Sequence, residues 1–214
     1  MRNLVSSFFL RALLFLIPAL AVWYLLRHWM VWLPAHLSGE LLAAIFPFWV
    51  RDYELHGTVL SLISSIQVRQ SGRVADLIFE VDVLAYCYGL PLLAAFFLAS
   101  NARRLVAKLA LGALILIPLQ VWGACFHLLM QVSAHGGEIA QWRTGFSTFH
   151  LNAFGLGYQI GYLLLPTLGP VMLWLWLERR FMVTVMFEAP EAQGVARHPR
   201  KDGIGRGRVD DAIT

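Results

Sequence analysis

The chain has 214 residues, of which 58% are apolar and only 14% are charged, and its mean hydropathy is +0.63. A typical soluble domain is roughly 45–50% apolar and about 25% charged. Because the apolar excess is gathered in long blocks, the composition argues against a separate soluble enzyme domain and indicates one membrane domain, residues 1–187. The net charge of +4 does not predict nucleic-acid binding, since the basic residues flank the apolar blocks and no recognition motif accompanies them.

The apolar blocks predict four transmembrane helices, because each approaches the ~20 residues that a helix needs to cross a bilayer core. We place these helices at residues 8–32, 84–100, 105–130 and 157–177. The first helix is expected to be interrupted near Arg27, which can extend its long side chain to the headgroups. We expect this first helix to be an uncleaved span and not a signal peptide, since no small-x-small cleavage site for a signal peptidase follows the apolar run before Trp23.

Residues 33–82 form a predicted extracytoplasmic insert between the first two spans. Leucines recur at helical spacing over residues 34–50, which is typical of a helix lying in the outer interface. Strand-forming residues follow, and Leu77, Phe79 and Val81 alternate with acidic positions, which predicts a strand. With a turn near residues 70–73, the insert is expected to hold a small β-hairpin or sheet that leans on the membrane face. The fold class is therefore an all-α integral membrane protein with a small extracytoplasmic β insert.

The basic residues predict the orientation of the chain. The short link between the second and third spans carries Arg103 and Arg104 and no acid, and such links stay in the cytoplasm. Both chain termini are then cytoplasmic. The segment 131–156 is expected to be an outer loop on the membrane surface, and the polar residues 188–214 are expected to form a disordered cytoplasmic tail.

One group of residues could carry chemistry near the outer end of the third span. A thiolate activated by a histidine, with an arginine to stabilise an oxyanion, would make an acyl-transfer site. Cys125 and His127 are two residues apart and point about 200° apart on a helix, so they cannot form this dyad. An enzyme would need another histidine to fold back onto the cysteine. The group comprises Cys125, His127, His135, Glu138, Arg143 and His150.

The same group does not have the spacing of a metal site, because neither HExxH nor an i,i+4 histidine pair occurs. We therefore predict no metal and no cofactor. A transporter or channel subunit is also a weak hypothesis, since the polar residues that could line a path in the spans are only Gln120, Gln131 and Gln159.

The segment VDVLAYCYGLPLLAAFFLA, at residues 81–99, resembles the exosortase H-associated membrane protein family. The layout of about residues 8–187 is similar as well: one span, an outer insert, a helical hairpin and a last span before a basic tail. The matching motif residues are Asp82, Tyr86, Tyr88, Gly89, Leu90 and Pro91.

The resemblance implies a partner of the exosortase type, a membrane Cys-Arg-His transpeptidase that processes proteins bearing a C-terminal sorting tail. It implies a non-enzymatic accessory protein in the bacterial inner (cytoplasmic) membrane and transfers no catalytic residues. The chain itself departs from an exosortase, since Phe126 and His127 follow Cys125 where Ser-Gly is expected. The candidates for contact with a partner, taken from the motif, the outer strand and the small-residue spacing, are Phe79, Tyr86, Tyr88, Gly89, Pro91, Gly157 and Gly161.

The alternative hypothesis is a membrane cysteine peptidase or transpeptidase that uses Cys125 with His150 and Arg143. The two hypotheses differ in what they require of Cys125, because an enzyme needs its thiol and an accessory protein does not. Besides the enzyme partner, the surrounding lipid bilayer is the other expected contact of the chain.

Overall fold

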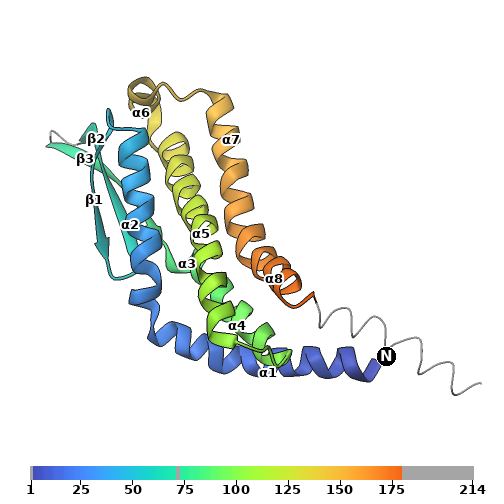
Figure 1. The fold of residues 1–214 in the computed structure, drawn as a ribbon. Coiled ribbons are helices and arrows are strands. Elements are labelled where there is room, and N and C mark those ends of the chain that lie inside the picture. Colours follow the sequence, from blue (N-terminus) through green and yellow to red (C-terminus); the bar gives the residue numbers. More distant parts are fainter. Residues whose placement is uncertain (1, 71–72, 180–214) are drawn as a thin grey trace, which may run out of the picture.

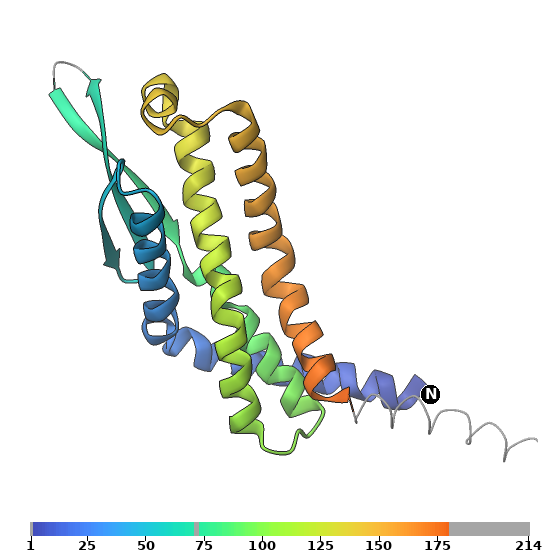
Figure 2. The same cartoon turned by 45° about the horizontal axis from the view of Figure 1, so that its top comes forward.

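The computed structural model describes residues 2–70 and 73–179, which form an elongated helical body with a small sheet at one end (Figure 1). Its longest element is α5 (Leu105–His135), which runs along the body. The chain then returns beside α5 through α7 (Thr148–Gln159), the π-helical turn η1 (Ile160–Leu164) and α8 (Leu165–Leu177). Figure 2 shows the same antiparallel arrangement from a second direction.

The first predicted span is divided into two helices. α1 (Arg2–Leu25) ends beside Arg27, where the helix over residues 8–32 was expected to be interrupted, and α2 (Arg27–Ile45) leaves in a different direction (Figure 1). At the break, the Arg27 guanidinium donates to the Tyr24 carbonyl over 3.3 Å and lies over the Tyr24 ring. Arg27 therefore satisfies an end carbonyl of α1. Pro34, which was expected to start a new helix, lies inside α2 instead.

The insert forms a three-stranded antiparallel sheet in the order β1-β2-β3, with β1 (Val50–His56), β2 (Val59–Gln70) and β3 (Arg73–Asp82). The predicted alternating strand is confirmed as β3. The segment before it was expected to be one run of strand formers, and the structure divides it into β1 and β2. Gly57 sits between them with φ +67°, a conformation that glycine adopts without steric cost.

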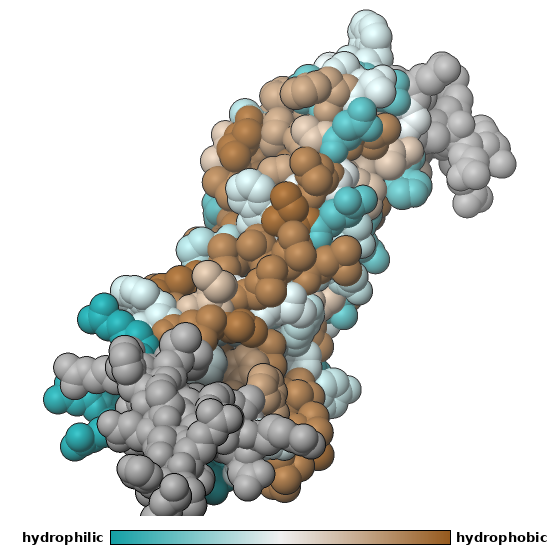
Figure 3. Space-filling view, turned by 90° about the vertical axis from the view of Figure 1, so that its right-hand side faces the viewer, coloured by the Kyte–Doolittle hydropathy of each residue, from teal (hydrophilic) through white to brown (hydrophobic). Residues whose placement is uncertain are grey.

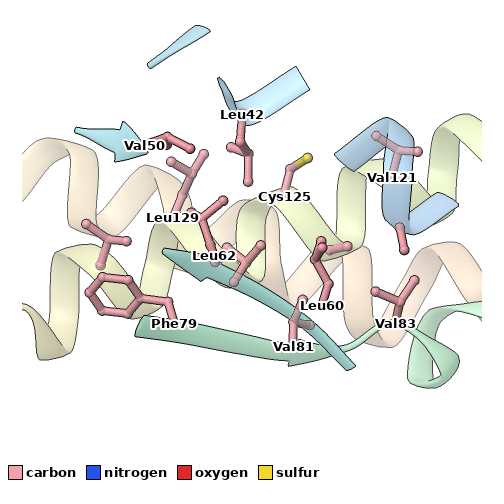
Figure 4. Close-up of a cluster of buried hydrophobic side chains, with 14 of the residues drawn as sticks. Leu42, Val50, Leu60, Leu62, Phe79, Val81, Val83, Val121, Cys125 and Leu129 are labelled. Carbon is pink, nitrogen blue, oxygen red and sulfur yellow. The ribbon is translucent and has the colours of Figure 1, made fainter. Parts of the chain in front are cut away.

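One face of the sheet is part of the hydrophobic core. Leu60, Leu62, Phe79 and Val81 point from β2 and β3 toward α2 and α5 (Figure 4). Each large side chain buried in this way contributes about 1.5–3 kcal/mol relative to an exposed position. The sheet is thus built onto the helices, as expected for a sheet too small to be stable alone.

Three helical stretches are long and apolar enough to span a bilayer: Ser6–Leu25, Leu105–His135 and Thr148–Leu177. The second predicted span, residues 84–100, is instead a short turn of helix, α3 (Leu84–Cys87), followed by α4 (Gly89–Ala99). As Leu84–Ala99 this apolar stretch is shorter than a full span, so four spans are not confirmed. α4 packs along α1.

The outer segment 131–156 is helical and not a loop. α5 continues to His135, α6 (Gly137–Thr144) follows, and α7 begins at Thr148. The Ser147 side chain caps the first turn of α7 together with His150. The last span therefore begins nine residues earlier than the predicted residue 157. The tail predicted for residues 188–214 lies outside the described residues.

The sheet and the basic link lie at opposite ends of the body. The α4–α5 link, residues 100–104, is at the end where α1 begins and α8 finishes (Figures 1 and 2). Near this end Phe8 stacks on Trp174 with ring centroids 5.0 Å apart. Between the two ends, the surface on the α7 and α8 side is largely hydrophobic (Figure 3) and includes exposed Leu163, Leu168 and Met172. A face with so many exposed apolar side chains fits contact with lipid.

Candidate functional site

A cluster of polar aromatic side chains lies inside the otherwise apolar helical body. α3 follows directly on β3 and turns Tyr86 inward, where its side chain is only 1% exposed. The Tyr86 hydroxyl and His127 Nδ1 on α5 are 2.8 Å apart and share a hydrogen bond. A buried hydroxyl needs such a partner, because an unsatisfied one costs about 1–3 kcal/mol. The bond therefore connects the turn that follows the sheet to the C-terminal half of α5, the longest helix.

Two further tyrosines complete this cluster from the returning helix. The Tyr158 ring on α7 lies 4.7 Å from the His127 ring, and Tyr162 on η1 stacks on Tyr158 at 5.6 Å. Tyr162 also contacts the Tyr86 ring edge at 5.9 Å. Tyr162 is 42% exposed, so the cluster extends from the buried Tyr86 to the surface of the molecule. We call these four residues the Tyr–His cluster.

The π-helical turn η1 lies at this cluster. π-helical turns are rare and occur frequently at functional sites. Within η1, Gly161 lies against Gly123 of α5, so that a Cβ added at Gly161 would come 2.7 Å from the Gly123 Cα. A Cβ at Gly123 would in turn come 2.3 Å from the Tyr86 ring. The two glycines thus permit the close helix crossing that brings Tyr162 to Tyr86.

The small-residue pair Gly157 and Gly161 was predicted to let another helix approach closely. The structure shows that the approaching helix is α5 of the same chain: Gly157 accepts a hydrogen bond from Trp122 Nε1 over 3.2 Å, and Gly161 meets Gly123.

The remaining partner-contact candidates are placed mainly inside the fold. Phe79 and Tyr86 are in the core, and Gly89 and Pro91 are buried where α4 begins. Tyr88 is half-buried. Any role of these residues toward a partner, other than that of Tyr88, would be exerted through the shape of the fold.

The residues of the alternative enzyme hypothesis have separate surroundings. Cys125 is 5% exposed, and its thiol faces the Ser38 carbonyl on α2 at 3.8 Å. His150 caps α7 through Ser147, and Arg143 is exposed on α6. The divergence expected of Cys125 and His127 is confirmed, because His127 faces Tyr86 and Cys125 faces α2. Nothing in this arrangement supports a cysteine peptidase.

The glutamines of the transporter hypothesis do not share a path. Gln120 is buried, Gln131 donates to the Glu80 carbonyl of β3 over 2.7 Å, and Gln159 is exposed. Among the described residues, no group of three or more His, Cys, Asp or Glu side chains could hold a metal ion.

The Tyr–His cluster offers three phenol hydroxyls and one imidazole, which can bind and position a polar group. Tyr86 and His127 are separate candidates from the sequence, in the motif and in the group around Cys125, whereas Tyr158 and Tyr162 are not among the candidates. The available signal was their spacing, because residues four apart lie on one face of a helix. Polar groups at such a depth in apolar helices are commonly functional or bind helices together.

The fold and the site together define a helical membrane protein with a sheet packed on its helices and a polar cluster suited to contact. A family model described as exosortase H-associated membrane protein matches residues 2–181, and the chain belongs to that family. Searches of curated proteins and of solved structures gave no match.

Proposed function

We propose that the protein is a non-enzymatic accessory that binds an exosortase-type enzyme in the bacterial inner membrane, with both of its own termini in the cytoplasm. The observation that carries this proposal is the family match over residues 2–181, since the family is described as exosortase H-associated. The separate surroundings of Cys125 and His150 support a role in binding and not in catalysis.

The surface end of the Tyr–His cluster is the contact that we assign to the enzyme within the membrane. Tyr162 is exposed on η1 and keeps Tyr158 and Tyr86 as ring neighbours. A tyrosine offers apolar area together with a hydroxyl, and such residues are enriched at protein interfaces. A polar group on a partner helix could form a hydrogen bond with the Tyr162 hydroxyl.

The test is a mild-detergent pull-down of the tagged protein from its native host, with quantitative mass spectrometry of the recovered membrane proteins. We expect the wild-type protein to recover a membrane Cys-Arg-His sorting enzyme. Tyr162→Ala should lower this recovery several-fold, because interface tyrosines are among the residues with the largest effects. Leu168→Ala, at an exposed apolar position in α8, is the matched control and should leave recovery unchanged.

Recovery of the protein alone, without any sorting enzyme, would argue against the association. Equal recovery by wild type and Tyr162→Ala would retain the association and exclude the Tyr–His cluster as its contact. Cys125→Ala distinguishes the accessory hypothesis from the cysteine-peptidase hypothesis. An accessory protein should still bind its partner and support sorting without this thiol, whereas a cysteine peptidase should lose its activity.

A further inference from the structure

A groove of about 590 Å³ opens between α1, α4 and α5. This volume lies within the range of about 300–1,000 Å³ that is usual for ligand sites. The lining side chains are apolar except for the indole N–H of Trp23, and several are small, including Ala94, Ala110 and Ala113. We call this space the α1–α4–α5 groove.

The groove is open because small side chains face one another where three helices meet. α1 crosses α4 before the chain bends at Leu26, and alanines on α4 and α5 leave the space beneath it unfilled. Protein interiors are close-packed, with few voids larger than a water molecule. Water is a poor occupant here, because a bound water needs two to four polar partners. The groove opens at the surface, where Val22 and Val106 are exposed, and its lining matches an apolar occupant.

The basic α4–α5 link adjoins one end of the groove. The lining residues Leu98 and Val106 flank the α4–α5 link in the sequence, and the link carries Arg103 and Arg104. Both arginines are exposed, and neither forms an ion pair in the described part of the chain. Nearby Lys108, by contrast, is paired with Glu178.

Glu178 is the carboxylate that reaches this end of the body, and it is paired with Lys108, while Arg103 and Arg104 have no acidic partner in the described part of the chain. The occupant that complements the site has an apolar chain for the groove and an anionic group for the arginines. A phospholipid with an anionic headgroup supplies both parts in one molecule. A transmembrane peptide would need an acidic residue at the level of the link.

We propose that the α1–α4–α5 groove binds one acyl chain of an anionic phospholipid, whose headgroup, with its net negative charge, contacts Arg103 and Arg104. The site is separate from the Tyr–His cluster and does not depend on the proposed function. Two arginines near an anionic headgroup should favour phosphatidylglycerol over phosphatidylcholine by about 5- to 30-fold in dissociation constant.

The experiment titrates the full chain in mild detergent with phosphatidylglycerol or phosphatidylcholine and counts 1:1 adducts by native mass spectrometry. Arg103→Gln with Arg104→Gln should bring phosphatidylglycerol down to the affinity of phosphatidylcholine. Ala110→Phe should fill the groove and weaken both lipids. Arg51→Gln, which removes an exposed arginine beside the sheet, is the matched control and should keep the preference.

The arginine pair keeps the test informative even if Ala110→Phe does not fold, because both arginines are exposed. A wild-type protein that binds the two lipids equally would overturn the proposal. So would a preference that survives loss of both arginines. Absence of 1:1 adducts would also overturn it and would indicate that a protein segment covers the groove.

Discussion

At the residue scale, the Tyr86–His127 hydrogen bond joins parts of the chain that are 41 residues apart. Tyr86→Phe and His127→Phe keep both rings and remove the bond, so each should lower the free energy of unfolding by about 1–3 kcal/mol. Their double-mutant cycle should show a coupling energy of about 0.5–1.5 kcal/mol. Denaturant-dependent tryptophan fluorescence in mild detergent measures these values. Additive effects would show that the two groups do not act together.

A second residue-scale contact lies beside the sheet, outside the candidate spans. The Tyr53 hydroxyl donates to Glu40 Oε1 over 2.7 Å. This hydrogen bond to Glu40 raises the pKa of Tyr53 above its usual value of about 10, with smaller contributions from burial and from the charges of Glu40 and Asp52. The neutral phenol is thus favoured in the folded protein.

The raised pKa of Tyr53 determines the direction in which the stability of the fold changes with pH. In the unfolded chain Tyr53 loses its proton at about pH 10, before the folded protein does. The contribution of the Tyr53–Glu40 hydrogen bond to the free energy of unfolding is therefore complete below about pH 10 and is lost as the pH rises through the higher pKa of Tyr53 in the folded protein. Glu40→Gln should lower the pKa of Tyr53 toward its usual value, as measured by NMR of tyrosine labelled at Cζ. Glu54→Gln is the control. An unchanged Tyr53 pKa in Glu40→Gln would contradict this assignment.

At the element scale, the two faces of β3 have different roles. Ile78 is 53% exposed, whereas Phe79 is 5% exposed and packs in the core. Phe79→Asp should destabilise the protein by at least about 3–5 kcal/mol, because it removes a buried ring and introduces an unpaired charge. Ile78→Asp should change stability by about 0.5 kcal/mol or less.

The sheet face that carries the exposed Ile78 is the second contact that we expect for the sorting enzyme. Ile78→Asp should therefore lower the amount of enzyme recovered in the pull-down, while the protein itself accumulates normally. Thermal stability in detergent and the amount of inserted protein provide the fold control. Unchanged recovery of the enzyme with Ile78→Asp would exclude this face of the sheet. If Phe79→Asp lowers recovery of the enzyme and Ile78→Asp does not, the loss reflects unfolding of the protein and not a lost contact.

The elements that the sequence predicted well are those with a local pattern. β3 was predictable because Leu77, Phe79 and Val81 alternate with polar positions. The break between α1 and α2 was expected near Arg27, because a charged residue interrupts the apolar run there. The continuation of α2 through Pro34 was not expected, because a proline usually marks a helix boundary. α6 was missed since eight residues bounded by glycines show too short a pattern for a helix.

At the scale of the whole molecule, the site was less predictable than the membrane class. The composition alone indicates a membrane protein, and the basic link predicts which end faces the cytoplasm. The Tyr–His cluster, in contrast, depends on tertiary packing, since a close crossing of Gly123 and Gly161 brings Tyr162 to Tyr86. A single sequence records no such long-range contact.

The orientation in the membrane can be tested with the natural cysteines in place. Cys87 and Cys125 are both buried, so they should react little with a membrane-impermeant maleimide. On intact spheroplasts, Asp52→Cys beside the sheet should be labelled, and Asn101→Cys in the basic link should be labelled only after lysis. The reverse pattern would place the sheet in the cytoplasm.

The packing of α1 on α4 has a consequence for the order of events during synthesis. α1 ends at Leu25, and α4 begins only at Gly89, after the whole sheet. At about 5–20 residues per second, the roughly 60 intervening residues take about 3–12 s to translate. For several seconds of synthesis, the nascent chain therefore contains the apolar helix α1 before α4, the helix on which it packs, has been made. During that interval the bilayer or a chaperone has to hold it.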